Sequence, residues 1–374
     1  MTAVKQWTVS MERRREEEEK MKLIKKYLNR IFIDGLTGMA QGLFATLIVG
    51  TIIQQLGNLI GGEAGAIIFQ LGKVAAAMTS AGIGVGVAYR FKESPLVVLS
   101  AATAGTVGGY ASKILAGTLI TEGNVLLAGP GEPLGAFIAA YIAIEVGHLV
   151  SGKTKIDILV TPIVTIMAGS AVGLLAGPPI SSFMTGLGAI INWGTEQQPF
   201  LMGIVVSVVM GMILTLPISS AALGIIMNLS GLAAGAATVG CCCNMIGFAV
   251  ASYRENKIGG LLAQGIGTSM LQVPNIVRRP LIWLPAILSS AILGPVGTML
   301  FKMTNNATGS GMGTAGLVGQ IMTFQTMVPA EGATVVLLKM SLIHFILPAI
   351  VTLLISEFMR KKGLIKFGEM KLDL

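Results

Sequence analysis

Polar and ionisable side chains stand at only a few places inside the long apolar runs of this chain. Hydrophobic residues make up 53% of its 374 residues and charged residues only 12%, whereas a soluble domain carries roughly one quarter charged residues. Inside a membrane each polar side chain is costly and usually faces a cavity or a partner. The chemistry that these groups offer is hydrogen bonding to a hydroxylated solute and proton exchange.

The first group of such residues is Glu132, in the Gly-rich stretch GPGEPLGA, followed by Glu145 and His148. Glu145 and His148 have the i, i+3 spacing that places two residues on one face of a helix. They could bind a sugar hydroxyl together, or gate a pathway by taking up a proton. The alternative is that His148 ends its helix near the cytoplasmic surface, beside Lys153.

The second group is the stretch GIGTSMLQVPN at residues 265–275, with Gln264 directly before it. Its two glycines and its proline break a helix and free backbone groups. Neutral side chains that both donate and accept hydrogen bonds suit sugar recognition in a cavity. Those in this stretch are Gln264, Thr268, Ser269, Gln272 and Asn275. The alternative is a glycine-packed helix whose polar side chains are satisfied internally.

The third group is Gln320, Gln325 and Glu331, in the last quarter of the chain. Gln320 is a neutral candidate for substrate binding, and Glu331 is either an inward-facing carboxylate or a solvated loop residue. Lysines also interrupt apolar runs, but long lysine side chains near helix ends normally extend to the membrane surface. Only Lys73, flanked by Gly72 and Ala75, is placed for a deep role.

The chain carries no motif of a self-contained enzyme. It has no phosphate loop for ATP hydrolysis, no nucleophile elbow, no HExxH motif and no aspartate-rich metal cluster. The cysteines Cys241, Cys242 and Cys243 are adjacent in an apolar run, where they cannot readily pair and match no zinc spacing. We therefore expect no catalytic residue, no metal and no cofactor, and a packing role for the cysteines.

Long apolar segments must position these residues, and several exceed the ~20 residues that cross a bilayer. They predict an all-α polytopic membrane protein with about ten transmembrane helices and two re-entrant hairpins. The crossings are expected at residues 35–60, 64–89, 95–119, 133–150, 156–176, 200–227, 229–252, 259–276, 280–302 and 333–359. The hairpins are expected at residues 178–193, which are rich in Gly and Ser, and at residues 309–327.

Parts of this pattern occur twice. ILVTPIVTIMAGSAVGLLAGP, with Pro162, and IWLPAILSSAILGP, with Pro285, both run through a proline to Ser-Ala and end in Gly-Pro. A second pair of apolar segments, with Pro217 and Pro348, follows in the same order. Transporters build sites inside the membrane from duplicated segments that Pro and Gly interrupt. We therefore expect the ligand where these breaks meet.

The net charge of +8 comes from basic residues that lie between the apolar segments, as in cytoplasmic loops. These residues form no patch interleaved with aromatic residues, which argues against nucleic-acid binding. Residues 1–30 are expected to form a charged helix in the cytosol or on the membrane surface, not a signal peptide. Residues 31–360 are expected to form one membrane domain and residues 361–374 a tail, with both termini cytoplasmic. Residues 254–257 fall outside in this arrangement, so residues 229–276 could instead form a pair of broken helices.

Several long runs resemble the bacterial phosphotransferase-system IIC family, which includes regulators labelled PfoR-type. They are FIDGLTGMAQGLFATLIVGTIIQQLG, KIDILVTPIVTIMAGSAVGLLAGPP, GIGTSMLQVPNIVRRPLIWLPAILSSAILGP and GSGMGTAGLVGQ, and the resemblance extends from about residue 31 to residue 359. It implies a permease for a sugar-like substrate in the bacterial cytoplasmic membrane, a homodimer, and phosphate supplied by separate IIA and IIB proteins. In glucose-type members a Gly-rich turn with Glu-Pro carries a substrate-binding carboxylate. Glu132 and Pro133 resemble it in dipeptide and context, although the surrounding residues differ.

The sequence therefore favours a sugar-translocating IIC component. A membrane sensor on the same fold, signalling through the charged N-terminal helix, is one alternative. An ion- or proton-coupled carrier of a small solute, using Glu132 and His148, is another.

Overall fold

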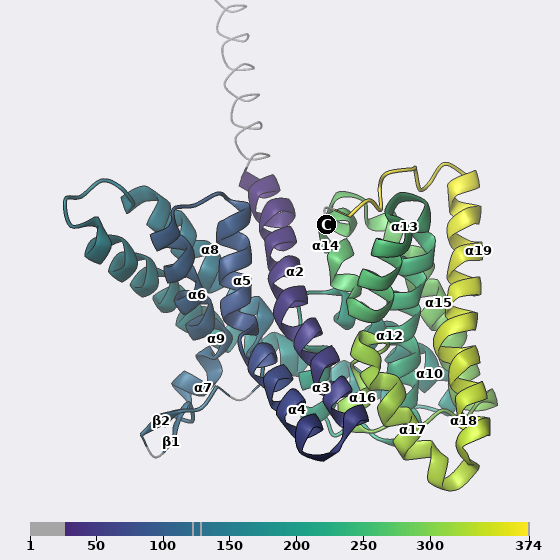
Figure 1. Ribbon diagram of the computed structural model, residues 1–374. Helices are drawn as coiled ribbons and strands as arrows, with labels where there is room; N and C mark the ends of the chain where they lie inside the picture. Colours follow the sequence, from purple (N-terminus) through teal and green to yellow (C-terminus); the bar gives the residue numbers. More distant parts are fainter. Residues whose placement is uncertain (1–26, 122, 128, 373–374) are drawn as a thin grey trace, which may run out of the picture.

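The computed structural model describes residues 27–121, 123–127 and 129–372, which are mostly helical. Most of the charged helix expected at residues 1–30 therefore lies outside the described residues. Figure 1 shows two groups of helices, with the first helix between them. That helix is one apolar segment, Tyr27–Ile60. It comprises η1 (Arg30–Gly35), α2 (Leu36–Leu43), η2 (Phe44–Ile48) and α3 (Val49–Ile60).

The first group holds the helices that follow in the chain. They are α4 (Gly62–Ala77), α5 (Thr79–Arg90), α6 (Pro95–Gly109), α7 (Ala111–Leu115) and α8 (Pro133–Val150). Two short antiparallel strands, β1 (Ile120–Thr121) and β2 (Asn124–Val125), pair Ile120 with Val125. They project away from the helices (Figure 1).

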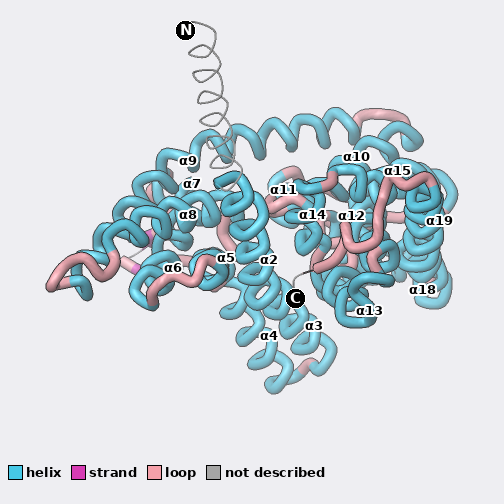
Figure 2. Tube along the Cα trace, turned by 90° about the horizontal axis from the view of Figure 1, so that it is seen from above, coloured by secondary structure: helices cyan, strands magenta, loops and turns pink. Residues whose placement is uncertain are grey.

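One long helix, α9 (Asp157–Thr195), connects the two groups. Figure 2 shows it running along one side of the molecule from the first group to α10. It continues through Pro162, Pro178 and Pro179, because prolines are tolerated in membrane helices where neighbouring groups satisfy the freed backbone. The hairpin predicted at residues 178–193 is therefore wrong, since these residues extend the preceding helix.

The second group contains the remaining elements. They are α10 (Pro199–Thr215), α11 (Ser220–Ile226), α12 (Gly231–Ala251), α13 (Tyr253–Leu262), η3 (Ala263–Gly267), η4 (Ser269–Gln272), α14 (Val273–Arg278), η5 (Pro280–Trp283), α15 (Leu284–Pro295), η6 (Val296–Leu300), α16 (Ala307–Ser310), η7 (Ala315–Leu317), α17 (Val318–Glu331), α18 (Ala333–Met340), η8 (Ser341–Ile346) and α19 (Leu347–Lys361). The helix α12 is almost entirely buried and packs against α10, α15 and α19.

Within the described residues, six helices are long and apolar enough to span a membrane. A seventh span results if the pair Gly62–Ala77 and Thr79–Arg90, bent by 53°, counts as one. Length and composition thus give fewer crossings than the expected number of about ten. The shorter apolar helices α6 and α10 account for part of the difference. The crossing expected at residues 259–276 is absent because this stretch is divided among α13, η3, η4 and α14.

The paired prolines stand in different surroundings. Pro162 lies inside α9 and Pro285 in the first turn of α15. Pro217 lies in the non-helical link between α10 and α11, whereas Pro348 begins α19 within the continuous segment Ala333–Lys361. The second sequence pair therefore does not mark equivalent breaks. The short helices that face each other are instead α11 and α16.

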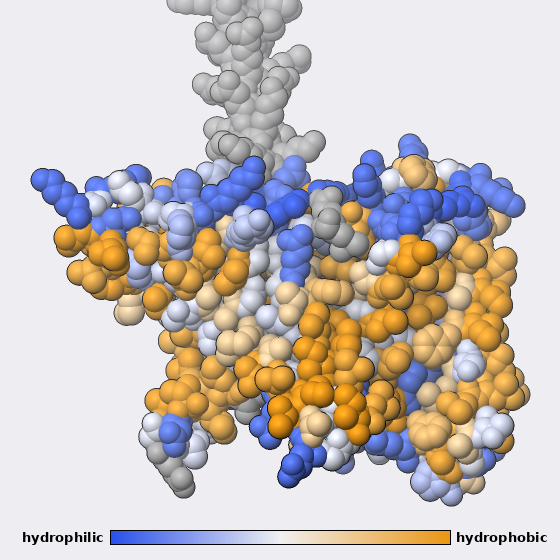
Figure 3. Space-filling view, viewed as in Figure 1, coloured by the Kyte–Doolittle hydropathy of each residue, from blue (hydrophilic) through white to orange (hydrophobic). Residues whose placement is uncertain are grey.

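Hydrophilic residues line one edge of the molecule above a broad hydrophobic band (Figure 3). The ends of α5, α13, α14 and α19 lie at this edge (Figure 1). We call it the basic face, since it carries Arg90, Lys92, Arg254, Arg278, Arg279 and Lys361. Residues 254–257 thus share a face with the basic end of α19, as Arg254 pairs with Glu357 at 3.0 Å.

Candidate functional site

The turn before α8 has a fixed conformation. Gly131 has a φ of +74°, which residues with a side chain rarely adopt. Three hydrogen bonds hold the turn to the ends of α5 and α6: the Tyr110 hydroxyl donates to the Gly129 carbonyl, Ser80 Oγ to the Pro130 carbonyl at 2.8 Å, and the Glu132 N–H to the Gly109 carbonyl at 2.7 Å. The Gly-rich sequence therefore sets the position of the Glu132 side chain.

The Glu132 carboxylate, in this turn and outside the spanning helices, joins the two groups of helices. The backbone N–H groups of Leu134, in α8, and Ser219, between α10 and α11, are close enough to the carboxylate to favour its charged form. Burial raises the pKa of Glu132 to about 7, and these two N–H groups oppose the rise. Its Oε1 atom is buried and has no hydrogen-bond partner. A buried acceptor without a partner costs free energy, so Oε1 is well placed to accept a hydrogen bond from a ligand hydroxyl.

Two irregular segments of the second group meet beside Ser219. The Ser220 hydroxyl donates to the Gly311 carbonyl at 2.6 Å, and a Cβ atom on Gly224 would overlap Ser310 Oγ. The Sγ atom of Cys241, in the middle of α12, lies 3.9 Å from the Ser310 carbonyl oxygen. Three breaks in the helical structure therefore converge: the turn before α8, the link between α10 and α11, and residues 309–317. We call this place the junction.

The stretch 265–275 does not act as one surface. Ser269 Oγ lies 2.8 Å from Thr215 Oγ1, which donates to Asn244 Oδ1 at 3.1 Å. Trp283 Nε1 donates to the same Asn244 oxygen at 2.9 Å. Ser269 therefore belongs to a buried polar cluster between α10, α12 and η5. Thr268 instead accepts from the Met270 N–H at 3.1 Å and begins η4, which is a structural role.

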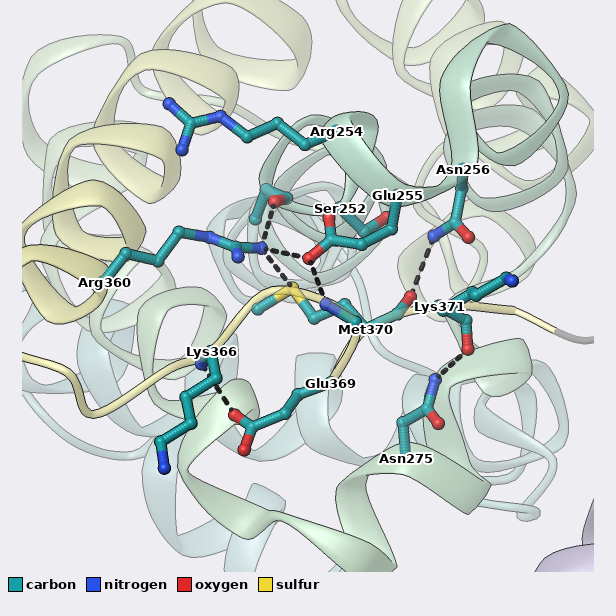
Figure 4. A network of polar contacts seen from close by, with 12 residues as sticks. Ser252, Arg254, Glu255, Asn256, Asn275, Arg360, Lys366, Glu369, Met370 and Lys371 are labelled. Atoms are coloured by element: carbon teal, nitrogen blue, oxygen red, sulfur yellow. Dashed lines mark hydrogen bonds and ion pairs between the residues drawn. The ribbon is translucent and has the colours of Figure 1, made fainter.

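The amides of this stretch form a chain of hydrogen bonds. Gln272 Nε2 donates to Gln264 Oε1, and Asn275 Nδ2 donates to Gln272 Oε1, both at 2.9 Å. Gln272 also donates to the Met370 carbonyl at 3.0 Å. Asn275 donates to the Lys371 carbonyl at 2.8 Å, as Figure 4 shows. We call Gln264, Gln272 and Asn275 the amide chain. The protein itself satisfies these groups, as the alternative interpretation of the sequence expected, but with carbonyls from the C-terminal residues.

Comparison with known families identifies the chain. The family described as "Phosphotransferase system, EIIC" matches residues 33–372, which include the junction, the polar cluster and the amide chain. The chain belongs to the phosphotransferase system EIIC family. This membership, with the apolar helices, supports a multi-pass membrane protein that serves as a sugar permease component of a phosphotransferase system. No curated protein sequence matches the chain.

Two of the residues predicted to bind substrate in this EIIC chain lie in an ion network on the basic face. Arg30 Nε donates to Glu145 Oε1 at 2.7 Å, and Arg30 Nη2 to Glu93 Oε1 at 3.3 Å. His148 Nδ1 lies 3.0 Å from Glu93 Oε2, and the His148 side chain is 61% exposed. Glu145 is about 20 Å along α8 from Glu132, at the helical rise of 1.5 Å per residue. The alternative interpretation, a histidine at the end of its helix, agrees with this position.

The last two predicted residues lie in separate surroundings. Gln320 Nε2 is 3.4 Å from His344 Nδ1 and 3.4 Å from Cys242 Sγ, between α12, α17 and η8. Glu331, at the end of α17, forms an ion pair with Lys339 at 2.7 Å. Lys73 lies on an exposed face of α4, with its Nζ atom 5.9 Å from the centre of the Phe69 ring. The structure brings none of these three side chains to the contacts that define the junction.

Sequence reasoning missed several residues of these polar sites. Ser219 and Ser220 follow Pro217 after one residue, so the predicted break was a signal for them. Asn244 follows the three cysteines in an apolar run and met the same criterion as Gln320. His344 is fully buried, and it interrupts an apolar run in the same way. Among the described residues, no group of three or more His, Cys, Asp or Glu side chains could hold a metal ion.

Proposed function

We propose that this EIIC chain binds a sugar at the junction and passes it across the membrane, with phosphate supplied by separate IIA and IIB proteins. The observation that carries the proposal is the Glu132 carboxylate. One of its oxygens is buried without a hydrogen-bond partner, and two nearby backbone N–H groups favour its charged form. Sugars present hydroxyl donors, and a charge-assisted hydrogen bond to a carboxylate is stronger than a neutral one.

The position of Glu132 also supports translocation. Its proximity to Ser219 places it where the two helix groups meet. A sugar that binds Glu132 therefore changes the interaction between the two helix groups. Binding energy can shift a conformational equilibrium only if the ligand contacts the two states differently. A carboxylate shared between two groups of helices meets this requirement.

The phosphoryl group must reach the sugar from the cytoplasmic side, which the positive-inside rule assigns to the basic face. The P–O, P–N or P–S bond on the partner protein breaks, and a P–O bond forms to a sugar hydroxyl, which loses its proton. We assign no residue of this chain to that step. A homodimer stays a prediction from the family.

Uptake by purified protein in proteoliposomes tests the proposal. A panel of radiolabelled hexoses, pentoses, hexitols and disaccharides is offered to the wild-type chain and to the Glu132→Gln and Glu63→Gln variants. Glu63 is an exposed acidic residue in the first turn of α4, so it is the matched control. We expect at least one sugar to bind and enter. Its affinity should fall by about tenfold or more in Glu132→Gln, as for a lost hydrogen bond to a charged group, and be unchanged in Glu63→Gln.

Adding phosphoenolpyruvate and a cytosolic extract with phosphotransferase activity tests the coupling. Accumulation of the sugar phosphate supports the permease, whereas accumulation of free sugar driven by a pH gradient would support the ion-coupled carrier instead. If no sugar of the panel binds to the wild-type chain, the proposed function is wrong.

A further inference from the structure

The C-terminal residues of the described chain fold back over the amide chain. After α19 ends at Lys361, glycines with φ values of +72° and +91°, Gly363 and Gly368, turn the backbone. Residues 366–372 then cross the basic face, as Figure 4 shows. We call residues 366–372 the strap.

The strap is anchored on α13. Asn256 bonds to it in both directions: its Nδ2 donates to the Met370 carbonyl, and its Oδ1 accepts from the Leu372 N–H, both at 2.8 Å. The Gly368 N–H donates to Glu255 Oε1 at 3.3 Å. That carboxylate also pairs with Arg360 at 2.9 Å, and this pair is almost fully buried. The Met370 side chain is completely buried, so the strap is packed against the protein and is not merely lying on its surface.

The strap also contacts both sides of the cleft between the first helix and η4–α14. Leu372 is 8% exposed and packs with Ala40, from the first helix, and Leu271, from η4. Behind the strap a cavity of about 20 Å³ remains, which is room for about one water molecule. The cavity is lined from the first helix by Thr37 and Gln41, from the second group by Pro274, Asn275 and Arg278, and from the strap by Lys371.

We propose that the strap is a latch that closes the cleft between the first helix and η4–α14 on the basic face and opens during transport. Its carbonyls occupy the donors of Gln272 and Asn275, and Leu372 holds the two sides together. The anchors are suited to release, because neutral hydrogen bonds contribute little net free energy each. The ion pair between Arg279 and Glu369, at 3.4 Å with the arginine side chain 68% exposed, is also weak. That the strap can open does not depend on the proposed function; that its opening serves sugar transport does.

A labelling experiment tests the latch without any transport measurement. Thr37 is 8% exposed and lines the cavity behind the strap, and the three native cysteines are fully buried. A Thr37→Cys chain in inside-out vesicles is treated with a membrane-impermeant maleimide. Adding Asn256→Ala removes two hydrogen bonds to the strap and leaves the amide chain intact. We expect this variant to react about tenfold faster, as the loss of two hydrogen bonds predicts.

The control is Arg254→Ala in the same Thr37→Cys background. Arg254 also lies on α13, but it pairs with Glu357 on α19 and not with the strap. We expect its labelling rate to equal that of the parent. An unchanged rate in Asn256→Ala, or an equal increase in Arg254→Ala, would overturn the latch. This result does not depend on whether a substrate is found.

A second measurement links the latch to transport. Cysteines at Ala40 and Leu372, joined by a reducible bifunctional thiol reagent, hold the strap closed. Uptake of the sugar identified above should stop after cross-linking and return after reduction. Full uptake by the cross-linked protein would show that the strap need not open. If the wild-type chain takes up no sugar, the proposed function fails, and the labelling rates alone decide whether the strap is a latch.

Discussion

Glu132 is a buried carboxylate that lies where the two groups of helices meet. Backbone N–H groups from both groups of helices favour its charged form, and its buried Oε1 atom has no hydrogen-bond partner within the protein. Ser219 is the residue that makes this arrangement possible, because its N–H comes from the opposite group of helices. The junction therefore depends on the packing of the two groups as much as on the Gly-rich turn.

The first prediction at this level concerns pH. Burial raises the pKa of Glu132 to about 7, so above that pH the group is a carboxylate that accepts a hydrogen bond, and below it the group is protonated. Sugar affinity should therefore fall by about tenfold as the pH decreases from about 8 to 6, following the deprotonated fraction of a group with this pKa. Equilibrium binding of a labelled sugar to protein in detergent measures it. The Glu132→Gln variant should bind weakly with no pH dependence, and an identical pH profile in that variant would assign the titration to another group.

The sequence makes Glu132 a candidate site residue, but it does not reveal that Ser219 lies beside it. Placing a glutamate in the turn of an apolar chain costs free energy unless the carboxylate has a partner or faces a cavity. The sequence alone is enough to recognise such a residue. The contact with Ser219 is not visible, because it joins segments that are distant in the chain. For the same reason, Glu145 and His148 share a helical face as predicted, yet Arg30 and Glu93 draw them into an ion network on the surface.

Among the elements, glycines set how closely α10, α12 and α15 approach. A Cβ atom on Gly240 of α12 would overlap the carbonyl oxygen of Ser207 in α10, and one on Gly294 of α15 would overlap the carbonyl oxygen of Gly203. Small residues allow such backbone contacts where lipid supplies no hydrophobic driving force between helices. This close packing holds Asn244 and its polar cluster between the same helices.

The second prediction follows from this contact. Gly240→Ala must push α10 and α12 apart, and overpacking of this kind destabilises a protein by about 1–3 kcal/mol. Thermal unfolding in detergent should show a clearly lower midpoint. Gly186→Ala in α9 is the control, because a Cβ atom there has no neighbour within 4 Å and alanine favours a helix by up to about 1 kcal/mol over glycine. Equal midpoints for the two variants would contradict the close contact of α10 and α12.

The sequence was least informative about where helices end. Pro178 and Pro179 predicted a break, but α9 continues through both residues. Conversely, the apolar run at residues 200–227 predicted one crossing, and the chain turns at Pro217 to form α11. Whether a proline ends a membrane helix depends on what its neighbours offer to the freed backbone groups, and that is a tertiary property. The helix α12 contains no proline, and the segments Pro280–Leu300 and Ala333–Lys361 continue through theirs. The positions of all three agree with predicted crossings.

For the whole molecule, the basic residues give a consistent orientation once the crossings are counted from the structure. The six long helices, the bent pair Gly62–Ala77 and Thr79–Arg90, and α6 are taken as crossings. Counted in this way, the chain returns to the basic face at four places, near Arg90, Lys153, Arg254 and Lys361. The helices α10–α11 and α16–α17 are not counted as crossings, and the breaks within these two pairs lie at the junction. Residues 254–257, which did not fit the sequence-based arrangement, now lie with the other basic loops, as the pair Arg360–Glu255 requires.

The last prediction tests this orientation. Basic residues accumulate in cytoplasmic loops, so Lys155→Cys and Lys257→Cys should both react with an impermeant maleimide in inside-out vesicles and not in right-side-out vesicles. Asn124→Cys, in the strand pair that projects away from the basic face, should show the opposite pattern. Lys257 is the decisive position. Counting residues 259–276 as a crossing predicts that it lies outside, whereas counting the crossings from the structure predicts that it lies on the same side as Arg90, Lys153 and Lys361. If Lys257→Cys reacts only in right-side-out vesicles, the strap lies on the outer side, and it cannot close a cleft through which the cytosolic proteins reach the sugar.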